Sequence, residues 1–217
     1  MTTPPIVAFI GLDGAGKSTQ IEMLKAAYEA RGLSVFVHPN PSLQGLSARL
    51  DEVAVEHGYD DRFAMLGPDT HKIMTAAVKW MAMSSLGTAP EGTDLIIADR
   101  YAYCQIAAAD ALGASNRWLI EGLFRGLPEP TLTLFMDLDP ALSVARVKER
   151  HPQEWIDHGF LTRQRDPPAA LPQESAWTWI AADATFEETD RCGLVAVAAQ
   201  TGDWMLHPSD AAEAMLG

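Results

Sequence analysis

Residues 11–19, with the sequence Gly-Leu-Asp-Gly-Ala-Gly-Lys-Ser-Thr, match the phosphate-binding pattern GxxxxGK[ST] at every fixed position. The apolar run 6–10 precedes this loop and predicts a buried strand, and a helical pattern follows it. Strand, glycine loop and helix form the arrangement that this motif requires, because backbone N–H groups and the helix N-terminus then surround phosphate oxygens. The motif therefore predicts binding of ATP or GTP. The residues expected to hold this nucleotide are Gly11, Gly14, Ala15, Gly16, Lys17, Ser18 and Thr19.

The composition limits the partners of such a chain. The 217 residues carry 16 basic and 29 acidic side chains, a formal net charge of −13. This balance argues against a nucleic-acid or membrane surface, because both need basic stripes. No apolar run approaches membrane-spanning length, and the first residues lack the features of a signal peptide. The two cysteines form no disulfide framework, which suits a cytoplasmic location.

Strand and helix patterns alternate along the whole chain. We expect strands at 5–10, 33–37, 95–98, 132–136 and 204–207. Helices are expected at 17–31, 43–57, 69–86, 101–111, 115–126, 140–150, 175–200 and 209–216. This alternation predicts an α/β fold, a five-stranded parallel sheet with helices on both faces, in a single domain over 1–217. The irregular, proline-rich stretch 151–173 is interpreted as a mobile lid.

A second chemical landmark follows the strand predicted at 95–98. Asp99, Arg100 and Tyr101 come directly after it. An acid at the end of a buried strand beside a phosphate loop can bind Mg²⁺ or accept a proton, and an adjacent arginine can contact a phosphate through two N–H groups. A helix-capping aspartate beside a surface arginine is the alternative interpretation.

The GLDGAGKST loop and the later DRY sequence resemble the thymidylate kinases, within the P-loop nucleoside monophosphate kinases. The segment 130–140 resembles the fourth strand of that family and its turn, and the basic residues of 146–150 resemble the run into its lid. The resemblance implies a P-loop NTPase fold, with ATP and Mg²⁺ as cofactors and a nucleoside monophosphate as the acceptor. It also implies a homodimer, with the region 101–126 available for contact with a second copy.

The resemblance also implies roles for individual residues. Lys17 would bridge the donor phosphates, Ser18 or Thr19 would bind the metal, and Asp99 would organise the metal and the attacking oxygen. Arg100 would hold the acceptor phosphate. The residues expected to carry catalysis are therefore Lys17, Asp13, Asp99, Arg100, Arg146 and Arg150, with Ser18 and Asp99 on the metal.

The chain departs from the family where the acceptor base should lie. Ile10 stands in place of a glutamate, and the family's Leu-Phe-Ala-Ala-Asp-Arg helix reads Met-Thr-Ala-Ala-Val-Lys over 74–79. Loss of a stacking ring and of hydrogen-bonding groups changes discrimination between acceptors. We therefore expect dTMP or a related deoxypyrimidine nucleotide, with or without a modified base, as the acceptor. The candidate substrate contacts are Asp13, His38, Asn40, Lys79, Arg100 and Gln105.

Three alternatives stay open at this point. The acceptor could be a free nucleoside or another small alcohol. The chain could be a GTPase-like switch, although it lacks the Asn/Thr-Lys-x-Asp sequence that reads guanine. It could also be a homologue that binds nucleotide without turnover. ADP production with and without acceptors separates these alternatives.

Overall fold

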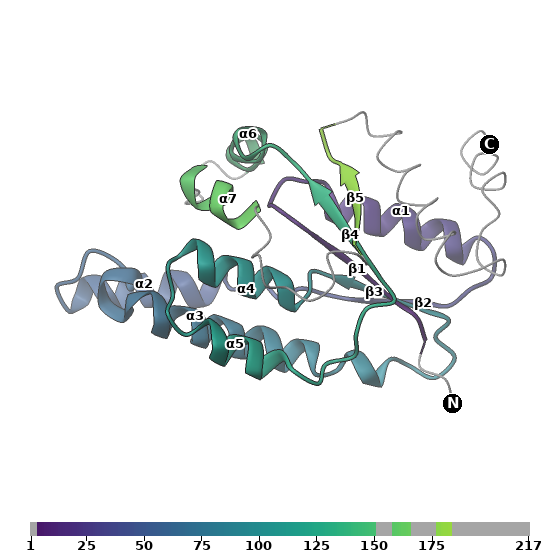
Figure 1. The fold of residues 1–217 in the computed structure, drawn as a ribbon, viewed down its shortest axis with the longest axis horizontal. Coiled ribbons are helices and arrows are strands. Elements are labelled where there is room, and N and C mark those ends of the chain that lie inside the picture. Colours follow the sequence, from purple (N-terminus) through teal and green to yellow (C-terminus); the bar gives the residue numbers. More distant parts are fainter. Residues whose placement is uncertain (1–3, 151–157, 166–176, 184–217) are drawn as a thin grey trace.

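A computed structural model describes residues 4–150, 158–165 and 177–183 of the chain. Its centre is a parallel sheet of five strands in the order β2-β3-β1-β4-β5. The strands are β1 (Ile6–Gly11), β2 (Val35–His38), β3 (Leu95–Asp99), β4 (Leu132–Asp137) and β5 (Trp177–Ala181). The predicted α/β class and parallel sheet are confirmed (Figure 1).

Helices cover both faces of this sheet because the strands are apolar on both sides. Val7, Phe9 and Met136 pack with side chains of α1 (Lys17–Glu29) on one face. Ile6, Ala8 and neighbouring strand residues pack on the other face against α3 (Arg62–Met83), α4 (Ala102–Ala111) and α5 (Arg117–Phe124). Figure 1 shows α1 on the opposite side of the sheet from α3, α4 and α5.

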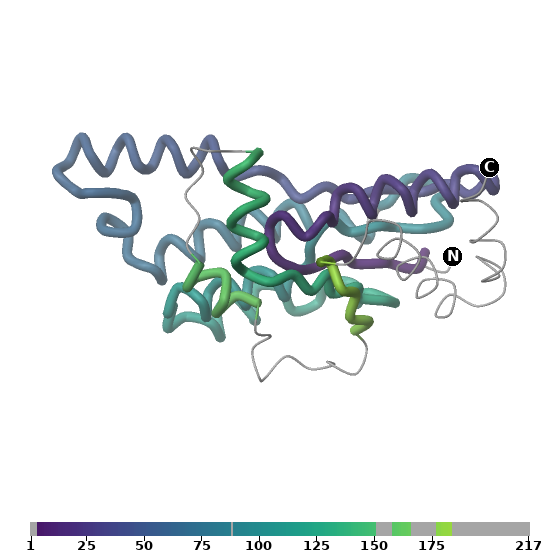
Figure 2. The backbone as a smooth tube through the Cα atoms, turned by 90° about the horizontal axis from the view of Figure 1, so that it is seen from above, coloured from purple at the N-terminus to yellow at the C-terminus, as the bar shows by residue number. Residues whose placement is uncertain are grey.

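The remaining elements extend from this sandwich or lie along its edge. They are α2 (Gln44–Glu56), a short 3₁₀ helix η1 (Leu86–Thr88), α6 (Pro140–Arg150) and α7 (His158–Arg165). Figures 1 and 2 both show α2 and the start of α3 projecting beyond the sheet. Of the helices in the described ranges, none is long and apolar enough to cross a membrane.

The long helix α3 is interrupted near its start. Gly67 has φ 70° and ψ 164°, and Pro68 follows it, so the helical hydrogen bonds are broken there. Asp61 caps the first segment by accepting from the Ala64 N–H at 2.8 Å. The helix predicted at 69–86 therefore corresponds to the second segment, which begins after this interruption.

The fifth strand was predicted in the wrong place. Residues 177–181 form β5, where a helix was predicted over 175–200, whereas 204–207 and 184–200 lie outside the described residues. Tryptophan, threonine and isoleucine favour an extended chain. The Trp177 ring stacks on Phe135 of β4 with centroids 6.0 Å apart, and the strand pairs with β4 in register.

The stretch predicted as an irregular lid contains a helix. Residues 158–165 form α7, and the rest of 151–173 lies outside the described residues. Two arginines attach α7 to the main body. Arg163 Nε donates to the Ala111 carbonyl at the end of α4 at 2.8 Å, and Arg165 forms two hydrogen bonds with the Asp137 carboxylate, of 2.7 and 2.9 Å.

Candidate active site

The glycine loop connects β1 to α1 at the carboxyl edge of the sheet. Gly11 pairs with Met136 of β4 and has φ 136°, and a Cβ on Gly11 would lie 2.4 Å from the Met136 carbonyl oxygen. Such a Cβ would clash with the rigid backbone of a neighbouring strand, so only glycine fits at position 11. The loop can therefore turn sharply toward the helix N-terminus directly at the strand end.

Lys17 is the first residue of α1 and is only 7% exposed. Its ammonium donates to the carbonyl oxygens of Gly11 at 3.1 Å and Leu12 at 2.6 Å. Burial, together with the neighbouring Arg100 charge, lowers the pKa of Lys17 to about 8. Lys17 is therefore still mainly protonated at pH 7, as a phosphate ligand must be.

Arg100 comes directly after β3 and contacts the loop from the other side. It is the one non-glycine residue with positive φ in the part of the chain that the structure describes, at 73°. Such backbone strain is found mostly at functional positions. Nη1 donates to the Gly11 carbonyl at 3.0 Å, and Nη2 forms an ion pair with Asp13. The Arg100 guanidinium holds the pKa of the Asp13 carboxyl below its usual value.

The helix α6 supports the loop from behind. Ser143 is fully buried, and its hydroxyl donates to the Asp13 carbonyl oxygen at 2.5 Å. Arg146 Nη1 donates to the carbonyl oxygens of Gly14 and Ala182, each at 3.1 Å. A Cβ on Gly14 would lie 3.2 Å from Arg146 Cβ, so the helix and the loop are in close contact.

A cleft of about 470 Å³ opens between the loop, the segment after β2, and helices α3 and α4. This volume is in the range that binds small molecules. Among the described residues, twelve of those predicted from the sequence as site residues line this cleft: Asp13, Gly14, Gly16, Lys17, Ser18, Thr19, Asn40, Lys79, Asp99, Arg100, Gln105 and Arg150. We refer to this space as the cleft.

The remaining predicted residues lie beside the cleft. Ala15 is buried in the core under the loop, and Arg146 faces the back of the loop. His38 lines a smaller adjoining pocket, and its Nε2 lies 2.9 Å from the Ala82 carbonyl oxygen, to which it can donate. Gly11 lines a separate apolar pocket.

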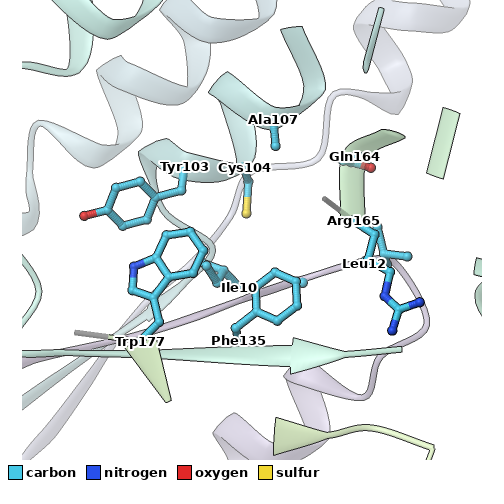
Figure 3. A pocket seen from close by; sticks show the side chains of 10 residues that line it. Ile10, Leu12, Tyr103, Cys104, Ala107, Phe135, Gln164, Arg165 and Trp177 are labelled. Atoms are coloured by element: carbon cyan, nitrogen blue, oxygen red, sulfur yellow. The ribbon is translucent and has the colours of Figure 1, made fainter. Parts of the chain in front are cut away.

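The apolar pocket is too small for a nucleotide. Its volume is about 30 Å³, and its walls include Phe135 and Trp177 together with Tyr103. Figure 3 shows the Cys104 sulfur pointing from α4 toward these rings, with Arg165 and Gln164 of α7 at the far side. Cys104 and Gln164 also line the cleft, so the pocket and the cleft share a wall.

Two lysines of α3 lie at the far end of the cleft, Lys79 in its wall and Lys72 behind the wall residue Gln105. Lys79 is 8% exposed, and its ammonium donates to Asn40 Oδ1 at 2.6 Å and to the Pro41 carbonyl. Lys72 is 4% exposed, and its ammonium donates to Gln105 Oε1 at 3.2 Å. Burial lowers the pKa of each lysine to about 8.

Sequence reasoning missed Lys72, Ser143 and Gln164. Lys72 has a sequence signal, because it stands seven residues before Lys79 and so shares its face of the helix. Ser143 and Gln164 have none, since a single serine or glutamine in a helix is common. Arg163 and Arg165 flank Gln164, yet they bind the Ala111 carbonyl and Asp137.

Comparison with known proteins agrees with this geometry. A family model described as thymidylate kinase matches residues 9–191. A thymidylate kinase of Bifidobacterium longum strain DJO10A is 29% identical over 180 residues, covering 76% of this chain and 84% of that protein. One from Magnetococcus marinus is 31% identical over 151 residues, covering 68% and 70%. One from Neisseria meningitidis serogroup B is 28% identical over 185 residues, covering 80% and 87%.

The match extends over most of the chain and includes the loop, Arg100 and α6, whose contacts form the cleft. The family transfers a phosphoryl group between nucleotides. The chain belongs to the thymidylate kinase family and is a nucleoside monophosphate kinase.

Proposed function

We propose that the chain transfers the γ-phosphoryl group of ATP to the 5′-phosphate of a deoxypyrimidine nucleoside monophosphate, dTMP or a related nucleotide with a modified base. The observation that carries this proposal is the position of Arg100. Its guanidinium lies between the phosphate loop and the far end of the cleft, and it contacts Gly11 and Asp13 on the loop side. A cation at this boundary suits an acceptor that already carries a phosphate, and suits a free nucleoside less well.

The donor phosphates would lie on the N–H groups of the loop, with Lys17 alongside them. The transferring phosphoryl group is loosely bonded in its transition state, so positioning and charge neutralisation provide most of the rate enhancement. Lys17 and Arg150 both line the cleft and would neutralise charge on the phosphates. Arg146 would contribute indirectly, by holding the Gly14 carbonyl and with it the shape of the loop.

Mg²⁺ fits the residues at this site. Ser18 and Asp99 both line the cleft beside Lys17. Within the described ranges, no group of three or more His, Cys, Asp or Glu side chains could hold a metal by themselves. Mg²⁺ on nucleotides commonly uses one or two protein oxygens, with water and phosphates as the other ligands. Ser18 and Asp99 would hold it, and when bound it neutralises phosphate charge.

Asp99 would also orient the acceptor. It precedes Arg100 in the chain, and it lines the cleft together with Lys17 and Arg100. The acceptor base would extend toward Asn40, Lys79 and Gln105, with His38 in the wall of the adjoining pocket. We further propose that residues 1–217 form one kinase domain with a lid over about 151–173. We also propose that the chain acts in the cytoplasm as a homodimer.

The test is ATP consumption with Mg²⁺ against a panel of acceptors. The panel contains dTMP, dUMP, dCMP, 5-modified deoxyuridine monophosphates and the matching free nucleosides. We expect turnover with one or more deoxypyrimidine monophosphates and at least a hundredfold lower kcat/KM with the nucleosides, because they lack the phosphate that Arg100 would bind. Faster turnover of a nucleoside than of its monophosphate would contradict the proposal. ATP binding without turnover of any acceptor would indicate a non-catalytic homologue.

A further inference from the structure

Two buried lysines at the far end of the cleft, one in its wall and one behind it, each bind a carboxamide that lines the cleft. Lys72 and Lys79 stand two turns apart on one face of α3. Lys72 donates to Gln105 Oε1, and Lys79 donates to Asn40 Oδ1. Neither lysine takes part in any of the ion pairs in the described part of the chain. Their contacts are therefore with neutral oxygens rather than carboxylates.

These contacts determine which way the two amides face. A protonated lysine only donates hydrogen bonds, so the carboxamide must turn its oxygen toward it. The nitrogen of the same carboxamide then points away from the lysine, and its two N–H groups can donate hydrogen bonds. Asn40 and Gln105 both line the cleft. Both also line the adjoining pocket next to Lys79 and Arg100.

We propose that Lys72 is a positioning residue that sets the base specificity of this kinase. It holds the Gln105 oxygen and so directs the Gln105 amide N–H groups toward the acceptor base, as Lys79 does for Asn40. The far end of the cleft is then a surface of hydrogen-bond donors. It selects a pyrimidine that carries a carbonyl oxygen at position 4 and rejects one that carries an amino group there. The amino group is itself a hydrogen-bond donor and would face the amide N–H donors of the cleft. This inference rests on the function proposed above.

Lys72 acts through Gln105 rather than on the substrate. Gln105 lines the cleft, whereas Lys72 lies behind it and is almost completely buried. Lys79 has a second task, because it also binds the Pro41 carbonyl and so anchors the segment after β2. Replacing Lys72 therefore changes the orientation of one amide with less disturbance to the wall of the cleft.

The test compares dUMP with dCMP, whose bases differ in the group at position 4 and in the proton that only uracil carries on N3. Lys72→Met removes the donor and keeps an unbranched side chain as far as Cε. We expect the ratio of kcat/KM for dUMP to that for dCMP to fall roughly three- to tenfold, mainly through KM, because the freed amide can turn its oxygen to an amino group. Lys72→Arg should restore the ratio, since a guanidinium also only donates. Lys25→Met, at an exposed ion pair with Glu29 on α1, is the matched control and should leave the ratio unchanged.

A second variant keeps the test decisive if Lys72→Met does not fold. Gln105→Glu preserves an oxygen for Lys72 and replaces the N–H donors by a second oxygen, so the preference should shift toward dCMP. The inference is overturned if the ratio in Lys72→Met stays at the parent value. If Lys72→Met does not fold, an unchanged ratio in Gln105→Glu overturns it instead. Either result leaves the kinase assignment intact. If the parent protein phosphorylates no monophosphate, the proposed function fails and this inference fails with it.

Discussion

Ser143→Ala tests whether α6 holds the phosphate loop in shape. The variant removes the buried hydrogen bond from the Ser143 hydroxyl to the Asp13 carbonyl oxygen. Loss of such a bond costs about 1–2 kcal/mol. Alanine returns up to about 0.5 kcal/mol through its higher helix propensity. The net loss of about 0.5–2 kcal/mol corresponds to a melting temperature lower by roughly 1–8 °C for a chain of this size.

The same variant should also affect ATP more than the acceptor, because Asp13 belongs to the loop. We expect KM for ATP to rise several-fold and KM for the acceptor to change less, measured by ADP release together with a calorimetric melt. Ser47→Ala, in the first turn of the projecting helix α2, is the matched control and should be neutral or slightly stabilising. A Ser143→Ala protein with the melting temperature and ATP KM of the control would refute the reasoning.

Three further predictions concern the charged groups of the cleft. Lys17→Ala should lower kcat/KM at least a hundredfold with little change in circular dichroism, if the lysine neutralises charge on the phosphates as proposed; near-parental turnover would contradict the P-loop assignment. Arg100→Lys should raise KM for the acceptor roughly tenfold or more and KM for ATP by much less, because lysine cannot make two parallel hydrogen bonds to a phosphate. Equal increases in both KM values would show that the acceptor phosphate does not bind at Arg100. The kcat/KM for ATP should fall about tenfold per pH unit above pH 8 as Lys17 loses its proton, as rates at saturating acceptor across pH 6–10 would test. Stability should not fall in parallel with the rate. The folded chain releases the Lys17 proton near pH 8, whereas the unfolded chain releases it only near pH 10.5. The contribution of Lys17 to the free energy of unfolding should therefore increase between pH 8 and pH 10.5, as denaturant titration can measure.

Local patterns in the sequence were enough to predict the centre of the fold. The loop 11–19 has fixed residue spacing and characteristic flanks, and the strand ending at Asp99 is a short apolar run followed by an acid. Both therefore predict an element and its chemistry without knowledge of the rest of the chain. The cleft contains them together because parallel strands end at the same edge of the sheet.

Features that depend on distant contacts could not be predicted in this way. The segment 177–181 becomes a strand because it pairs with β4 and its Trp177 stacks on Phe135, whereas the alanines after it favour a helix. Ser143 acquires its position only when α6 packs on the loop, 130 residues away in sequence. The pairing of Lys72 with Gln105 spans 33 residues and depends on how α3 packs against α4.

The interruption at Gly67 and Pro68 has a consequence for the insertions and deletions that this chain can tolerate. A residue added or removed between 57 and 66 would alter the short first segment of α3 and its ion pair between Arg62 and Asp51. The non-helical backbone at Gly67 would absorb the change. An insertion between Lys72 and Lys79 would instead rotate one lysine by about 100° relative to the other, so that the two would no longer share one face of the helix. Natural variation in length should therefore be concentrated before Gly67.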